Sequence, residues 1–220
     1  MQDTVTFFTG FQLSDLWFLA EAAWRTLLIS VLSISAGTLL GAVFGWLLHE
    51  GKLAATLLLS PVLDAFRSVP LIIQLVLFYN FAPIIGLNLD PFASGVAILT
   101  IYTAALVANV ARGGIEAAGK PMRNAARSLG MTYWQDLRHV VLPIGGRAVF
   151  PAWVGVALGV MKDSALVSVL GYVELLKASQ ILITRTQDPF LILTLAGAFY
   201  FALSYPVSRY AARLEQRWAQ

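Results

Sequence analysis

Long apolar stretches separated by short polar segments dominate the 220-residue chain. A helix that crosses a membrane needs about 20 predominantly apolar residues, because the hydrocarbon core is about 30 Å thick. Four stretches are candidate spans, at residues 26–48, about 69–81, 92–111 and 189–207. A fifth candidate span begins at residues 148–161. The pattern therefore predicts an all-α integral membrane protein with about five transmembrane helices.

Polar residues and a proline interrupt the stretch 53–81. Asp64 and Arg67 are i,i+3 neighbours on a helix, a spacing that favours an ion pair. Pro70 lacks a backbone N–H and is expected to kink or break the helix. We therefore interpret the residues before Val69 as an interfacial segment, and residues 82–91 as a loop.

Glycines recur every four residues in the first span, at Gly37, Gly41 and Gly45, and so share one helix face. Small residues on a common face allow two helices to approach closely. The helix that packs there belongs either to the same chain or to a second copy of the protein. The sequence leaves both interpretations open.

The composition supports a membrane protein and excludes other classes. The chain is 58% hydrophobic and 12% charged, about half the charged share of about 25% in soluble domains. The net charge of +3 does not indicate nucleic-acid binding, because the basic residues cluster beside apolar spans. With no cysteine and two isolated histidines, His49 and His139, neither a disulfide nor a metal site is expected.

The distribution of lysine and arginine predicts the orientation. Residues 112–147 hold six of them and the tail from Ser208 holds three, whereas the loop 82–91 holds none. Because these residues favour the cytoplasmic side, the 112–147 region and the C-terminus are expected inside and the N-terminus outside. Lys162, Lys177 and Arg185 then lie on the outer side, against the rule. Residues 1–10 lack the positive charge of a cleavable signal peptide, so the first apolar segment is expected to remain as an anchor.

The region 112–147 carries signals for two short helices. Pro121 suits the first turn of a helix, and Gly130 suits a left-handed stop. Thr132 and Gln135 have the spacing of a capping box, and Pro143 is expected to end the second helix or open the next. The apolar positions of the two helices share one face, which packs either on the ends of the spans or on a partner.

The same region resembles the EAA loop of ABC-transporter permease subunits: Glu-Ala-Ala, three residues, Gly, nine residues, Ile, one residue, Leu-Pro. This chain has Asn124-Ala125-Ala126, Gly130, Val140 and Leu142-Pro143 at that spacing. In the family the loop docks in a groove of a separate ATPase subunit and transmits its closure. The resemblance implies this coupling role for Asn124, Ala125, Ala126, Arg127, Leu129, Gly130, Trp134, Leu142 and Pro143. Asn124 departs from the family's Glu and removes a charge that faces the partner.

Three further segments resemble the polar amino-acid branch of the family: FRSVPL at 66–71, RGGI at 112–115 and KDSALVSVLG at 162–171. The resemblance implies a type I importer fold in the bacterial inner membrane, with five spans and the N-terminus outside. Residues 1–220 are then one transmembrane permease domain with a cytoplasmic two-helix coupling loop at about 116–143.

The resemblance also implies the partners. They are two ATPase subunits that use ATP and magnesium, a second permease copy or a paralogue, a substrate-binding protein, membrane lipid and a polar amino-acid substrate. No cofactor or metal is expected on the chain itself. It has no G-x-x-x-x-G-K-[ST] phosphate loop and is therefore not expected to hydrolyse ATP alone, so we expect no enzyme activity of its own.

Polar residues within or beside the apolar stretches are candidates for a translocation pathway or gate, because charge in a membrane tends to face a cavity or a partner. The candidates are Arg67, Gln74, Asn109, Lys162, Asp163 and Ser164; for the uncharged Gln74 and Asn109, interhelical hydrogen bonding is the alternative. Val156 joins them because many amino-acid permeases have Asn followed by Glu or Gln at the positions of Gly155 and Val156. The resemblance then implies a neutral or acidic substrate, or a contact supplied by a paralogous subunit.

Two other functions compete with the permease. A self-sufficient secondary transporter often shows inverted repeats, and this sequence shows no repeat. A membrane-embedded serine hydrolase needs a serine activated by a base, yet neither histidine lies inside a predicted span and no G-x-S-x-G occurs. Ion-driven uptake without an ATPase would favour the first alternative, and replacement of both histidines without loss of function would exclude the second.

Overall fold

A computed structural model describes residues 10–51 and 53–218, and every regular element in these ranges is helical. The signal-peptide prediction falls mostly on residues 1–9, outside the described residues. In chain order the elements are α1 (Leu13–Glu50), α2 (Leu53–Ser68), α3 (Leu71–Phe81), η1 (Ala82–Ile85), α4 (Pro91–Ala117), α5 (Lys120–Ser128), α6 (Tyr133–Asp136), η2 (Leu137–Val141), α7 (Leu142–Asp163), η3 (Ser164–Leu170), α8 (Leu175–Thr186) and α9 (Pro189–Trp218).

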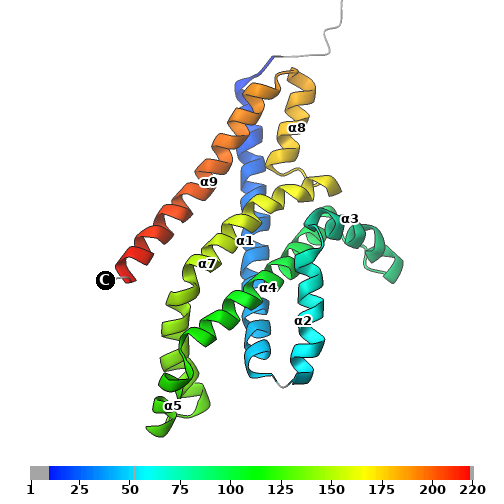
Figure 1. The fold of residues 1–220 in the computed structure, drawn as a ribbon. Coiled ribbons are helices and arrows are strands. Elements are labelled where there is room, and N and C mark those ends of the chain that lie inside the picture. The colour runs from blue at the N-terminus through cyan, green and yellow to red at the C-terminus, as the bar shows by residue number, and fades with distance from the viewer. Residues whose placement is uncertain (1–9, 52, 219–220) are drawn as a thin grey trace, which may run out of the picture.

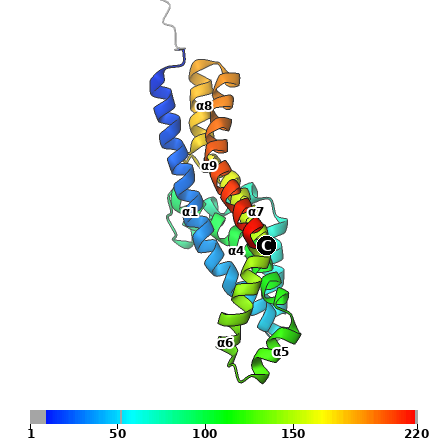
Figure 2. The same cartoon turned by 90° about the vertical axis from the view of Figure 1, so that its left-hand side faces the viewer.

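Helix α1 runs along one side of the molecule, from the α8 end toward the α5 end, and begins 13 residues before the predicted span (Figures 1 and 2). Its 38 residues extend about 57 Å, more than the hydrocarbon thickness. The polar residues of the added turns have partners. Asp15 pairs with Arg185 of α8, and Glu21 pairs with Arg25 at 2.6 Å. The sequence pattern underestimated the helix because these charges are compensated by other side chains.

The glycine face of α1 packs on α4. A Cβ placed on Gly37 would lie 2.5 Å from the Cβ of Thr103, and one on Gly45 would lie 2.5 Å from the carbonyl oxygen of Ala108. Gly41 is equally tight, at 2.7 Å from the Cβ of Val107. These distances leave no room for a side chain, so the glycines let the two backbones approach. The intramolecular interpretation is confirmed.

Helices α2 and α3 form a broken pair, bent by 107° around Pro70. The break at the proline and the Asp64–Arg67 ion pair are both as predicted. The predicted span at 69–81 is wrong as a separate helix, because the 11 residues of α3 extend only about 16 Å. Only α2 and α3 together are apolar and long enough to cross a membrane, as one broken span.

Four other regions are long and apolar enough to cross a membrane: Leu13–Glu50, Pro91–Ala117, Tyr133–Leu170 and Pro189–Trp218. With the broken pair the total is up to five, in agreement with the sequence. Helix α9 continues to Trp218 without ending at 207. The basic tail is therefore an extension of the last span.

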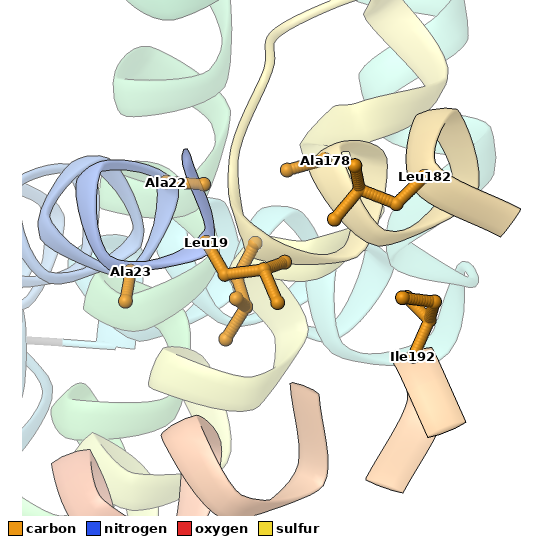
Figure 3. Close-up of a cluster of buried hydrophobic side chains, with 7 residues drawn as sticks. Leu19, Ala22, Ala23, Ala178, Leu182 and Ile192 are labelled. Atoms are coloured by element: carbon orange, nitrogen blue, oxygen red, sulfur yellow. The ribbon is translucent and has the colours of Figure 1, made fainter. Parts of the chain in front are cut away.

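The two ends of the molecule hold different elements (Figures 1 and 2). The α8 end holds the start of α1, α8 and the start of α9; the α5 end holds α5 and α6. Figure 3 shows Leu19 and Ala22 of α1 near Ala178 and Leu182 of α8 and Ile192 of α9, which are part of one buried apolar cluster. The α8 end therefore has a hydrophobic core of its own.

Candidate functional site

The first helix of the predicted coupling loop ends in a glycine turn. Pro121 occupies the first turn of α5, and Gly130 adopts a left-handed conformation with φ 88°. The amide of Met131 donates to the carbonyl of Ala126 at 3.2 Å, and that of Gly130 donates to Arg127 at 3.0 Å. This pair of bonds is a Schellman motif, which satisfies carbonyls at the end of a helix. The predicted role of Gly130 in the turn is confirmed.

The second helix begins with the predicted capping box. The Oγ1 of Thr132 accepts from the amide of Gln135 at 3.4 Å, and the Gln135 side chain accepts from the amide of Thr132 at 2.8 Å. Helix α6 then passes through the π-helical turn η2 directly into α7. Pro143 stands in the first turn of α7, where its missing N–H costs little. Of the two roles predicted for Pro143, the structure shows that it opens the next helix.

The sequence left open whether the loop packs on the ends of the spans or on a partner. The nine predicted coupling residues include both buried and exposed side chains. Ala126 is buried, whereas Asn124, Ala125, Arg127, Gly130 and Pro143 are exposed, as are Leu129 (84%), Trp134 (67%) and Leu142 (60%). Trp134 nevertheless stacks on Trp46 of α1 with ring centroids 6.4 Å apart. The indole N–H of Trp46 donates to the hydroxyl of Tyr133 at 2.7 Å. One face of the loop thus packs on α1, and the tip around Leu129 is free.

An ionic link joins the loop to α1 through Arg123. The sequence pattern did not identify Arg123 as a functional residue. The Nε of Arg123 lies 2.9 Å from Oδ2 of Asp136, and Nη1 lies 3.1 Å from Oε1 of Glu50. Burial works to lower the pKa of Arg123, but the hydrogen bonds and charges of Asp136 and Glu50 outweigh it and raise the pKa above its ordinary value. Asp136 is the only acidic residue between 117 and 147, a signal that could have identified the pair.

Two pathway candidates have structural partners at the break between α2 and α3. The buried amide of Gln74 donates to the carbonyls of Phe66 and Val69 at 2.8 and 2.7 Å. Arg67 pairs with Asp64 and donates to the carbonyl of Ala105 at 3.4 Å. Gln74 thus satisfies carbonyls at the end of α2, and Arg67 links α2 to a carbonyl within α4. Hydrogen bonding, the alternative for Gln74, is therefore what the structure shows.

The other five candidates lie on α4, α7 and the start of η3. Ser164 is buried between helices, where its hydroxyl lies 3.2 Å from that of Ser30. Val156 packs against the apolar cluster around Leu75 and Leu99, whereas Asn109 and Lys162 are exposed and Asp163 is half-buried. Within the described residues, no ion pair or side-chain hydrogen bond joins any two of the seven candidates. The chain alone does not gather them into one site.

The comparison with known families decides what kind of protein this is. A family described as the binding-protein-dependent transport system inner membrane component matches residues 23–220. The chain belongs to this family. It is therefore a multi-pass permease component of the inner membrane, as the resemblance in the loop and the flanking segments indicated.

Similar proteins cover nearly the whole permease. A probable glutamine ABC transporter permease protein of Bacillus subtilis (strain 168) is 31% identical over 216 residues, which are 96% of this chain and 98% of the relative. The glutamine transport system permease protein of Escherichia coli (strain K12) is 29% identical over 213 residues, or 94% and 97% of the two chains.

Solved structures share the fold. An amino acid ABC transporter with histidines aligns with a TM-score of 0.82 at 30% identity, over 91% of this chain and 94% of that chain. An inward-facing methionine ABC transporter aligns with a TM-score of 0.77 at 23% identity, over 94% and 99% of the two chains. The permease therefore has the type I ABC importer fold that the sequence predicted.

Proposed function

We propose that the permease translocates a polar amino acid, or a close analogue, delivered by a substrate-binding protein. The observation that carries this proposal is the exposed helix–turn–helix tip at the α5 end, at the EAA spacing. Its Schellman turn presents Leu129 away from the spans. The similar proteins, two glutamine permeases and an amino acid ABC transporter, support the substrate class.

ATP is used by partner subunits in this proposal. Two ATPase subunits bind ATP and magnesium, and a second permease copy or a paralogue completes the pathway. Closure of the ATPase pair moves the tip, and the continuous path from α6 through η2 into α7 carries the movement to the spans. Access then alternates because the ATP-bound state favours one conformation of the permease over the other.

The orientation follows from charge. The α5 end carries six lysines and arginines between 112 and 147, so we place it in the cytoplasm, with the C-terminus inside and the N-terminus outside. The α8 end then faces the binding protein. Arg185 at that end forms an ion pair with Asp15. Its positive charge is therefore compensated and argues less strongly against this orientation.

The remaining candidates for the substrate pathway lie on one stretch of α7 and η3 and on α4. Lys162, Asp163 and Ser164 lie where α7 passes into η3, and Asn109 is exposed on α4. We propose that this face is completed by the second permease. A Cβ added to Gly155 would meet nothing within 4 Å, and Val156 carries no charge. The chain itself therefore offers no carboxylate there, which favours a neutral or acidic substrate, or a cationic one held by a paralogue.

Reconstitution tests the function. Proteoliposomes that contain the permease, its co-purifying ATPase and the binding protein should take up glutamine only when ATP is supplied. Leu129→Asp should abolish ATPase binding and uptake, because it places a charge on the free apolar tip. Leu129→Met, which keeps an apolar side chain of similar size at the tip, is the matched control and should retain binding and uptake. Uptake that follows a proton or sodium gradient and ignores ATP would overturn the proposal.

A further inference from the structure

The tip of the coupling loop carries a positive charge that its own residues do not cancel. Residues 118–139 hold four cationic side chains, Lys120, Arg123, Arg127 and Arg138, and one acidic side chain, Asp136. With His139 neutral, four positive charges minus one negative charge leave +3. The charge of Arg123 is taken up by Asp136 and Glu50. Lys120 and Arg127 have no carboxylate partner among the described residues.

These free cations surround a hollow on the surface of α5. The hollow has a volume of about 320 Å³ and is lined by Lys120, Arg123, Asn124, Arg127 and Asp136. Asp136 is 1% exposed and bound to Arg123, so the accessible part of the lining is cationic or neutral. Asn124 is the residue at which this chain departs from the Glu of the EAA pattern. A carboxylate there would place a negative charge among these cations.

We propose that the ATPase surface that receives α5 is acidic, with carboxylates that enter this hollow and pair with Lys120 and Arg127. The amide of Asn124 donates a further hydrogen bond to such a carboxylate. Charge-assisted bonds of this kind are shorter and stronger than neutral ones, and arginine can bind a carboxylate through two parallel bonds. This inference rests on the proposed function, because it specifies the partner of the same loop.

A protein partner fits the tip better than a lipid surface does. Leu129 and Met122 are exposed on the same short helix and turn, at 84% and 52%. The tip lies at the far α5 end of the molecule, away from the long apolar helices (Figure 2). Apolar side chains beside fixed charges suit an interface with an apolar centre and a polar rim. The partner surface should therefore have an apolar socket bordered by carboxylates.

The test measures the affinity of the purified ATPase subunit for the detergent-solubilised permease. Sodium chloride is raised from about 0.1 M to about 1 M, which shortens the Debye length from about 10 Å to about 3 Å. We expect the wild-type Kd to rise with salt. Asn124→Glu should raise the Kd about tenfold at low salt, because a like charge then faces the partner's carboxylates. Asn124→Gln, which keeps the amide, is the matched control and should bind like wild type.

Each outcome separates the inference from the proposed function. An ATPase that binds tightly but responds neither to salt nor to Asn124→Glu would overturn the acidic surface and leave the docking intact. A permease that binds no ATPase under any condition would overturn the proposed function itself. Binding of the wild type to phosphatidylglycerol vesicles that is lost in Arg127→Gln, with ATPase binding unchanged, would assign the charge to anionic lipid. Arg127→Lys, which keeps the charge, is the control in that arm.

Discussion

Glu174 at the α8 end and Asp136 at the α5 end are both buried carboxylates, and the two are satisfied in different ways. Glu174, at the α8 end, is 0% exposed and accepts from four neutral groups. These are the amides of Leu176 (2.9 Å) and Lys177 (2.8 Å) and the hydroxyls of Tyr200 (3.1 Å) and Thr26 (3.4 Å). Asp136, at the α5 end, depends on Arg123, and its Oδ1 is buried without a hydrogen-bond partner among the described residues.

The difference indicates which end is rigid. The donors to Glu174 come from α1, α8 and α9, so this one carboxylate caps α8 and fastens three helices together. The link through Arg123 and Asp136 holds α5 to α6 and to Glu50 of α1 through one side chain. A single ionic link can break and reform without unfolding its surroundings. We therefore expect conformational change to concentrate at the α5 end, where we propose that the ATPase docks.

The largest effect is expected at Glu174. Glu174→Leu leaves the amides of Leu176 and Lys177 and the hydroxyl of Tyr200 without their acceptor, and each such group costs about 1–3 kcal/mol when buried. The hydroxyl of Thr26 keeps the carbonyl of Ala22 at 3.1 Å as an acceptor. We expect the free energy of unfolding to fall by about 4 kcal/mol. Denaturant unfolding in detergent, followed by circular dichroism, measures it. Glu174→Gln, which keeps one acceptor oxygen, should lose less, and equal losses would mean that the apolar shape matters more than the hydrogen bonds.

A smaller effect with a definite order is expected at the α5 end. Arg123→Gln leaves the Asp136 carboxylate buried and unpaired, which should cost about 3 kcal/mol. Asp136→Asn removes that charge and leaves Arg123 paired with Glu50 at 3.1 Å, so the loss should be about 1 kcal/mol. The same unfolding measurement ranks the two variants. A larger loss in Asp136→Asn than in Arg123→Gln would show that Arg123, and not the buried Asp136, is destabilised more by losing its partner.

Local signals made the helix–turn–helix predictable. Gly130 and the pair Thr132 and Gln135 specify their turn and cap through residues no more than five positions away. Likewise, the four-residue period of the α1 glycines placed them on one face. The helix that packs there is α4, which only the folded chain could identify.

Long-range partners explain what the sequence did not predict. Asp15 at the start of α1 accepts locally from the amide of Gln12 at 2.8 Å, but its charge is compensated by Arg185, 170 positions away. The carboxylate of Glu174 accepts from the hydroxyl of Thr26, 148 positions away. Gln74 has polar partners only because the chain folds back at Pro70. A pattern of single residues cannot identify such pairs, and so charged or polar residues that are compensated in the fold were interpreted as span boundaries or pathway candidates.

The smallest effects come from two matched tyrosine variants, one for each end. The hydroxyl of Tyr200 donates to the Glu174 carboxylate, and hydrogen bonds to charged groups contribute about 1.5–3 kcal/mol. The hydroxyl of Tyr133 accepts from the neutral indole of Trp46, a bond that contributes about 1 kcal/mol. Tyr200→Phe should therefore destabilise the permease about twice as much as Tyr133→Phe in the same unfolding measurement.

Tyr133→Phe should also shift the fluorescence emission of Trp46, with Trp46→Phe as the reference that identifies its signal. A larger loss in Tyr133→Phe would mean that the α5 end is held as firmly as the α8 end, and the site of conformational change would then have to be sought at the break between α2 and α3.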